Sequence, residues 1–404
     1  MTTDMRASLA GATFMFALLA FSPGEASAVG GNCSRIDPEF TPNPPTAVTQ
    51  LGLPDAWQLS RGAGVTVAVV DTGVDPDNPH LGATVLPGTD LVGDSDGRVD
   101  TSGRGTALAG QIAAQMLPNS GVIGFAPEAK ILPVRVLETE ESDTADGVGA
   151  DPVRTATGIR WAAEAGAQII VVPHAFESST DALTTAVRTA SDSGALIVAA
   201  ASNPDANTAD TRPVTFPAGY PEAVAVAALT VEGVPSEGKQ GVHVELVAPG
   251  QEVATTFRDL GDCTLSSDRA SAALASGYVG GAAALIAAAH PDETPADWQY
   301  RLLATALRPS AAERDPGLGW GIVAPAAALN VVNDGLAPGP PNPHPGRTPA
   351  PSKPAMATPP AGGDQAPQRL WTIGWLCGGG VTVMAIAALA AWLWRQPRGS
   401  THPR

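Results

Sequence analysis

Lysine, cysteine and basic charge as a whole are scarce in this sequence. Only three lysines occur (Lys130, Lys239, Lys353), and 23 basic side chains stand against 40 acidic ones, for a net charge of -17. Because the chain has no surplus of positive charge to neutralise phosphates, we expect no nucleic-acid partner. Three cysteines are too few for a disulfide scaffold. Hydrophobic residues make up 44% of the chain and charged residues 16%, which excludes wholesale disorder.

The first 28 residues have the pattern of a secretory signal peptide. A mostly apolar run, Leu9–Phe21, is followed by Ala26-Ser27-Ala28, which fits the small-x-small pattern of a cleavage site. We therefore predict a signal peptide over 1–28, with a short uncleaved membrane anchor as the alternative.

The other end of the chain carries a second apolar stretch, 370–394, without a charged residue in 25 positions. At about 1.5 Å per residue it is long enough to cross the hydrocarbon core of a bilayer. Tryptophans lie near both of its ends, and three arginines follow in 395–404. This pattern predicts a single transmembrane helix with a cytoplasmic tail and an external ectodomain at the plasma membrane. A buried core helix is the alternative.

Proline is concentrated between the predicted span and the rest of the chain. The stretch 336–369 is rich in proline and cannot bury a core, so we expect an extended stalk there. The stalk would lift an exported domain, 51–335, off the membrane. Residues 29–50 would form an N-terminal extension of that domain.

Within 51–335, apolar runs alternate with helical patterns. The runs are Val65–Val70, Lys130–Leu137, Ala167–Val172, Ala195–Ala200, Ala223–Leu229 and Val242–Val247, and the helical patterns are Thr106–Gln115, Pro152–Ala165 and Asp181–Ser193. Such alternation predicts an α/β fold with a mostly parallel central sheet and helices on both faces. In such a sheet, function is expected beyond the carboxyl ends of the strands. One run ends there in Asp71, which is either a functional carboxylate or a turn-forming residue.

Six segments, in the same order, resemble those of subtilisin-like serine proteases. They are GVTVAVVDTGVD (Gly64–Asp75), GVIGFAPEAKILPVRVL (Gly121–Leu137), ALIVAAASN (Ala195–Asn203), VTFPAGYPEAVAVAAL (Val214–Leu229), VELVAPG (Val244–Gly250) and GLGWGIVAPAAAL (Gly317–Leu329). The resemblance implies the subtilisin-like fold. Together with the predicted signal, extension, stalk and span, the chain is similar to the mycosin branch, membrane-anchored subtilases associated with type VII secretion.

The resemblance assigns Asp71 to the Asp of the catalytic triad and Asn203 to the oxyanion position, but the other two triad positions depart from the family. The family's His stands in G-H-G-T-x-V-A-G, where this chain has GRGTALAG with Arg104 in its place. The family's Ser stands in G-T-S-F-A-A-P-Y-V-x-G, where this chain has SAALASGYVGG with Ala273 in its place. Alanine has no atom that can attack a carbonyl, and arginine stays protonated and cannot act as a base.

We therefore expect no catalysis from Arg104 and Ala273, and a salt bridge between Arg104 and Asp71 in place of the His–Asp pair. Arg104 turned toward solvent is the alternative. None of the remaining histidines is expected beside Asp71, so a relocated triad is disfavoured. Pro173, at the strand end that pairs with a peptide in the family, lacks an N–H. Peptide binding is therefore doubtful, although the substitution could also be harmless.

Two smaller features concern covalent and metal sites. Cys33 and Cys263 both lie in the exported region, where thiols oxidise, so we predict a disulfide between them, with two free thiols as the alternative. The segment 91–103 carries Asp94, Asp96 and Asp100, and we interpret it as a solvated acidic loop rather than a calcium site. We expect no metal and no cofactor.

We therefore predict a pseudoprotease of the mycosin type. It would be anchored in the membrane and act as a scaffold or docking domain, with the type VII secretion membrane complex as the expected partner. The alternatives are an active serine endopeptidase with a rearranged site and a peptide-binding module that does not cut.

Overall fold

The computed structural model describes Cys33 and residues 40–139, 147–201, 214–236, 241–315 and 317–343. The predicted signal peptide, transmembrane helix and cytoplasmic tail lie outside these residues, as does Asn203. They remain predictions from the sequence.

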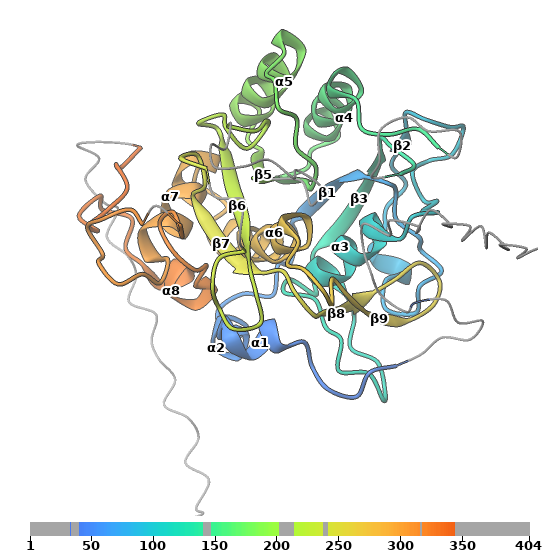
Figure 1. The fold of residues 1–404 in the computed structure, drawn as a ribbon, viewed down its shortest axis with the longest axis horizontal. Coiled ribbons are helices and arrows are strands. Elements are labelled where there is room, and N and C mark those ends of the chain that lie inside the picture. Colours follow the sequence, from blue (N-terminus) through green and yellow to red (C-terminus); the bar gives the residue numbers. More distant parts are fainter. Residues whose placement is uncertain are drawn as a thin grey trace, which may run out of the picture. The chain divides into compact units, whose positions relative to one another are not determined.

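Seven parallel strands form the central sheet, in the order β2-β3-β1-β4-β5-β6-β7 (Figure 1). The strands are β1 (Thr66–Asp71), β2 (Thr89–Asp90), β3 (Lys130–Arg135), β4 (Ile169–Val172), β5 (Leu196–Ala200), β6 (Ala223–Leu229) and β7 (Leu246–Pro249). The predicted fold class is confirmed. One predicted strand was placed too early: the Val244 N–H bonds to the Gly241 carbonyl in a turn, so the strand begins at Leu246.

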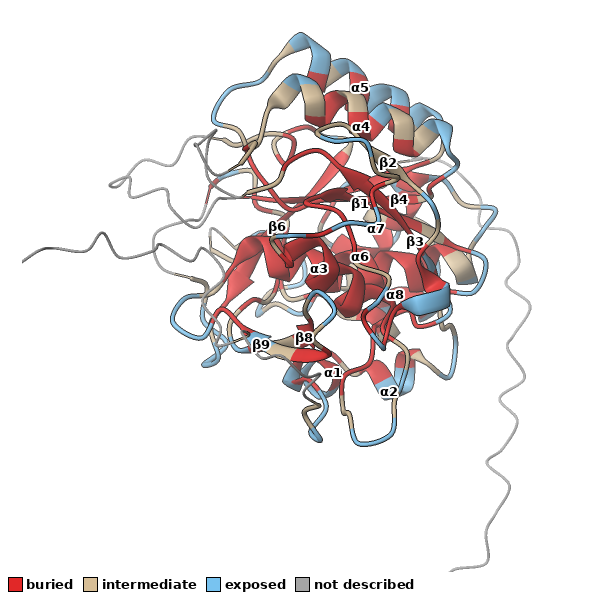
Figure 2. Cartoon of the chain, turned by 90° about the vertical axis from the view of Figure 1, so that its right-hand side faces the viewer, coloured by how far each residue is buried: buried red, intermediate tan, exposed pale blue. Residues whose placement is uncertain are grey.

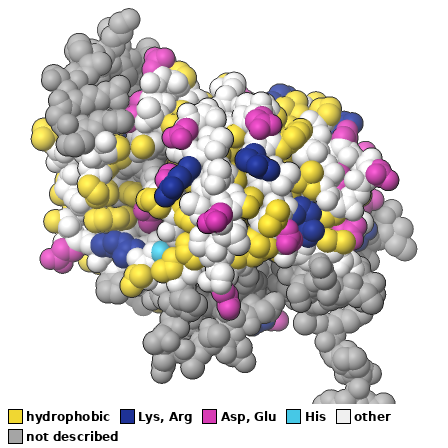
Figure 3. Space-filling view, turned by 90° about the horizontal axis from the view of Figure 1, so that it is seen from above, with side chains coloured by type: hydrophobic (Ala, Val, Ile, Leu, Met, Phe, Trp, Pro, Cys, Tyr) yellow, Lys and Arg dark blue, Asp and Glu magenta, His cyan; other side chains and the backbone are white. Residues whose placement is uncertain are grey.

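Alternate side chains of the strands point to opposite faces, and each face is covered by helices (Figure 2). Val67 and Val69 of β1 belong to the core beneath α3 (Arg104–Ala113) and α6 (Ala272–Ala289). Ala68 and Val70 belong to the core beneath α4 (Pro152–Glu164) and α5 (Asp181–Asp192). The outer face over α4 and α5 carries charged side chains of both signs among apolar ones (Figure 3).

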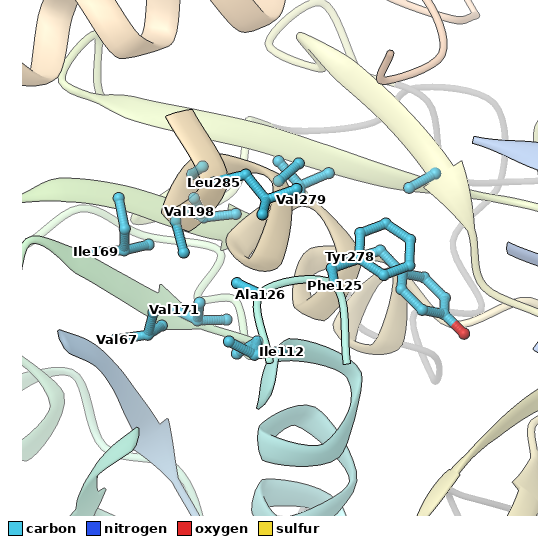
Figure 4. Packing of buried hydrophobic residues seen from close by; sticks show 14 of the residues in the cluster. Val67, Ile112, Phe125, Ala126, Ile169, Val171, Val198, Tyr278, Val279 and Leu285 are labelled. Carbon is cyan, nitrogen blue, oxygen red and sulfur yellow. The ribbon is translucent and has the colours of Figure 1, made fainter. Parts of the chain in front are cut away.

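Helix α6 is long and apolar enough to cross a membrane, yet it is the central core helix of the domain. In its apolar 18-residue window, 89% of the residues are buried inside the protein. The ring centroids of Tyr278 and Phe125 are 4.7 Å apart. Val279 belongs to the same core as Val171 of β4 and Val198 of β5 (Figure 4).

The remaining elements lie around this three-layer body. They are α1 (Thr46–Gln50), α2 (Leu53–Ala56), the 3-10 helix η1 (Gly82–Thr84), α7 (Pro295–Thr305), α8 (Pro325–Asn330) and an antiparallel hairpin of β8 (Val253–Thr256) and β9 (Asp262–Leu265). The hairpin was not predicted from the sequence. It packs against the N-terminal half of α3. The hydroxyls of Thr255 and Thr256 donate to the carbonyls of Ala107 and Thr106, both at 2.7 Å.

Candidate functional site

Asp71 and Arg104 meet at the carboxyl end of the central strand. Asp71 is the last residue of β1 and Arg104 is the first residue of α3, and both side chains are buried. The Arg104 Nε lies 2.9 Å from Asp71 Oδ2 and 3.2 Å from Oδ1, and Nη2 also donates to Oδ1. The predicted salt bridge is thus present, with a forked geometry that only a guanidinium can offer a carboxylate.

This pair decides the charge state of the site. Burial by itself raises the pKa of Asp71, but the Arg104 guanidinium outweighs it, so the pKa lies below its ordinary value. Asp71 is therefore an ionised carboxylate. It offsets a cation that would otherwise be unfavourable at a helix N-terminus.

The start of α3 is held in place by Asp100. Its Oδ1 accepts from the Gly103 N–H at 2.7 Å, and its Oδ2 accepts from the N–H and the hydroxyl of Thr106. Burial raises the pKa of this carboxyl. The interpretation of 91–103 as a solvated acidic loop was therefore wrong for Asp100, because the unpaired N–H groups of a helix start recruit this carboxylate as a cap.

Gly103 explains how Arg104 can sit so close to the sheet. It is the N-cap of α3 with φ 95°, a left-handed conformation that favours glycine. A Cβ at this position would lie 2.3 Å from the Phe257 ring. The tip of the β8–β9 hairpin thus covers the turn that delivers Arg104 to Asp71.

At the second erased position, Ala273 is a buried residue in the first turn of α6. The two neighbouring serines are engaged with the backbone of the same helix. The Ser271 hydroxyl accepts from the Leu274 N–H at 3.4 Å as the N-cap, and the Ser276 hydroxyl donates to the Ala273 carbonyl at 2.6 Å. Neither hydroxyl substitutes for the missing nucleophile in this arrangement.

The expectation that no histidine lies beside Asp71 was wrong. His174 follows the end of β4, the neighbour of β1, and its Nδ1 lies 3.9 Å from Asp71 Oδ1. Parallel pairing of Val69 with Val171 brings the two strand ends level, and the family motifs carry no trace of this neighbourhood. Burial lowers the pKa of His174, and Asp71 only partly counteracts this, so the ring is neutral at physiological pH.

The far side of His174 faces Thr155 of α4. The ring Nε2 and the threonine hydroxyl are 2.9 Å apart, and Thr155 has no exposed surface. The three groups stand in the order carboxylate, imidazole, hydroxyl of a serine protease triad, but His174 Nδ1, 3.9 Å from Asp71, makes no hydrogen bond to it. The hydroxyl, however, lies inside the layer between β-sheet and α4, where a substrate carbonyl cannot reach it.

The disulfide and metal predictions concern other parts of the domain. Cys33 and Cys263 form a disulfide, with their Cα atoms 5.9 Å apart. Among the described residues, no group of three or more His, Cys, Asp or Glu side chains is arranged to hold a metal ion.

Comparison with known proteins shows which family this chain resembles. The family described as the subtilase family (Peptidase S8) matches residues 62–321. The chain is 34% identical to Mycosin-3 of Mycobacterium tuberculosis (strain ATCC 25618 / H37Rv), an alignment that covers 84% of this chain and 82% of that protein. It is 33% identical to thermitase of Thermoactinomyces vulgaris over 61% of this chain and 86% of thermitase.

Two solved structures resemble the fold. The MycP3 protease from the type VII (ESX-3) secretion system superposes with a TM-score of 0.63 at 30% identity, covering 74% of this chain and 91% of that one. MycP1 from the ESX-1 type VII secretion system gives 0.64 at 27% identity, covering 75% and 91%. The parallel sheet, the motif order and these matches agree: the chain belongs to the subtilase family and is of the mycosin type.

Proposed function

We propose that this chain is a membrane-anchored, catalytically inactive mycosin that serves as a docking domain in a type VII secretion membrane complex. The observation that carries the proposal is the buried Arg104–Asp71 ion pair, combined with alanine at position 273. The two substitutions act on separate functions, since Arg104 replaces the base and Ala273 replaces the nucleophile. An intact, well-packed fold with both functions removed favours a binding role over turnover.

A single reversion tests the loss of catalysis. Ala273→Ser restores a hydroxyl, but Arg104 cannot accept its proton, so we expect no labelling by a fluorophosphonate probe. Removal of the nucleophile or the histidine from a related protease costs about 10⁶-fold in kcat. Labelling of the wild-type protein would refute the proposal.

An endopeptidase with a rearranged site is the first alternative, and the His174–Asp71 contact is the observation in its favour. It would have to use Thr155, which is buried on the sheet-facing side of α4. Thr155→Val tests it, because a catalytic hydroxyl cannot be replaced by a methyl group without loss of labelling. Ser271→Ala is the matched control at a hydroxyl that caps α6.

A peptide-binding module that does not cut is the second alternative. Pro173 has no N–H to donate to a bound peptide, which argues against it. The double variant Arg104→His/Ala273→Ser measures what remains of the groove. If it hydrolyses peptides at a rate well above background, the groove has survived and the binding module becomes the better proposal.

The partner is proposed from the relatives, two of which are described as components of type VII secretion systems. Co-purification of the full chain from membranes, with Arg104→His/Ala273→Ser as the matched comparison, tests the docking role. We expect the same complex with both proteins, because docking would not depend on the erased site. Isolation of the chain alone would contradict the proposal. Removal of 370–404 is expected to release the ectodomain from the membrane.

A further inference from the structure

The last described stretch of the chain, 337–343, is rich in proline and lies within the region for which the sequence predicts an extended stalk. In the structure Pro340 is buried. A Cβ on Gly335 would collide with the side-chain nitrogen of Asn342, so these two residues are in contact. The chain therefore turns back on itself against the domain before it continues beyond 343.

Arg308, three residues beyond the end of α7, is the side chain that this stretch meets. Every hydrogen bond that its guanidinium makes within the described chain ends on a backbone carbonyl oxygen. The acceptors are the carbonyls of Leu303, Ala306, Ala311, Trp320 and Pro338. Nη2 reaches the Pro338 oxygen at 3.2 Å, and Nη1 reaches the Trp320 oxygen at 2.9 Å. One side chain thus joins the end of α7 to the proline-rich stretch.

The hydrogen-bonding chemistry of the two partners is complementary. Proline has a carbonyl oxygen but no N–H, so a stretch with prolines at 338, 340, 341 and 343 offers mainly acceptors. A guanidinium carries N–H donors on several sides and has no acceptor. Because the rings also fix φ, a proline-rich stretch loses little conformational entropy when it is held in one place.

Trp320 and Gly339 complete the contact. The Arg308 guanidinium carbon lies 5.3 Å from the centroid of the Trp320 ring, a favourable cation–π arrangement. Gly339 has φ 118°, and a Cβ there would collide with Nη2 of Arg308 and lie 2.8 Å from the Ala311 carbonyl oxygen. Glycine alone combines this backbone conformation with so close an approach.

This contact lies at the edge of the sheet opposite to the erased catalytic site. The Trp320 N–H donates to the carbonyl of Glu245 at 2.7 Å, and Glu245 directly precedes β7. The contact is therefore at the amino ends of the parallel strands. Asp71, by comparison, is the last residue of β1 and lies at their carboxyl ends.

We propose that Arg308 and Trp320 form a clamp that binds residues 338–340 and fixes where the chain leaves the domain. The free part of the stalk then begins after 343 instead of at 336, and it starts from the edge of the sheet that faces away from Asp71. The clamp itself is independent of anchoring and of any partner. For an anchored chain, a consequence that rests on the proposed function, only 344–369 would set the distance between the domain and the predicted span.

A spin label at position 341 tests the clamp in the full chain in detergent. Pro341→Cys places the label on an exposed residue of the stretch, and Cys377→Ser removes the thiol outside the disulfide. We expect an immobilised label, with the same protein unfolded in urea as the mobile limit. Arg308→Met should lower the ratio of immobilised to mobile label about ten-fold or more, as for a lost hydrogen bond to a charged group.

Arg314→Met is the matched control for the arginine. Arg314 also donates to backbone carbonyls beside β7, those of Val242 and Val244, which lie outside the clamped stretch. We expect this variant to leave the label as immobile as in the parent. Equal release by Arg314→Met and Arg308→Met would contradict a specific role of Arg308.

Gly339→Ala separates the clamp from the stability of the domain. Arg308 also binds carbonyls at the end of α7, so its loss is expected to lower the melting temperature as well. Gly339→Ala keeps that cap and should free the label while the melting temperature stays near that of the parent. Gly166→Ala, at φ 84° with open space around the new Cβ, is the control and should not free it. A label that is fully mobile in the parent, or that stays immobilised in both Arg308→Met and Gly339→Ala, would overturn the proposal.

Discussion

Replacement of Asp71 by asparagine removes the carboxylate that faces Arg104 while it keeps the size of the side chain. Both partners are buried, with 0% and 3% of their side chains exposed. Breaking a buried ion pair from one side costs about 3–5 kcal/mol, because the remaining charge is left without compensation. At about 2–4 °C of melting temperature per kcal/mol for a domain of this class, the midpoint should fall by roughly 10 °C.

Thermal unfolding of the full chain, followed by near-UV circular dichroism, measures this effect. Asp96→Asn is the matched control, because Asp96 pairs with Arg98 on the surface, where an ion pair contributes little. We expect the control to melt with the wild type, and the double variant Asp71→Asn/Arg104→Met to recover part of the loss. If Asp71→Asn melts with the control, the argument that Asp71 is retained as the counter-charge of Arg104 fails.

The same pair predicts an acid dependence. Because the pKa of Asp71 is lowered in the folded protein, its contribution is present above the ordinary pKa of about 3.9 and is lost as pH falls through the folded value. The difference in unfolding free energy between wild type and Asp71→Asn should therefore shrink as the solution is acidified below about pH 4. A difference that is constant with pH would contradict the assignment.

Three further predictions concern other groups. Burial raises the pKa of Glu245 from 4.5 to about 7, so the native state loses stability as pH rises through this interval, and Glu245→Gln should remove that decline in a chemical denaturation series. Burial lowers the pKa of His174 below 6.5, so its contribution to the free energy of unfolding is present above that value and is lost on acidification. His174→Gln should therefore reduce the fall in unfolding free energy that the wild type shows as pH drops below 6.5. Gly103→Ala should destabilise the domain more than Gly194→Ala, since both have φ 95° but only the first new Cβ meets the Phe257 ring; a strained backbone alone costs about 1–2 kcal/mol. Equal melting temperatures for the two alanine variants would refute the contact with Phe257.

Much of the fold was accessible from the sequence because it depends on local patterns. Continuous apolar runs such as Ala223–Leu229 mark strands that are buried on both faces, and the observed β6 has the predicted bounds. The hairpin of β8 and β9 was missed because its strands have four residues each and only partly apolar faces. The strand expected at Val242 begins four residues later, because the chain makes a local turn from Gly241 to Val244 although valine is a strand-favouring residue.

The sequence by itself determined which side chains stand at the positions of the family's His and Ser, namely Arg104 and Ala273. Alanine offers no nucleophile and arginine no base wherever the fold places them. The order of the strands was decided by the tertiary structure alone, and it places His174 beside Asp71 although they are about 100 positions apart in the chain. The same holds for the cap that Asp100 provides, because contacts between distant segments follow from how the layers pack and leave no periodic trace in the sequence.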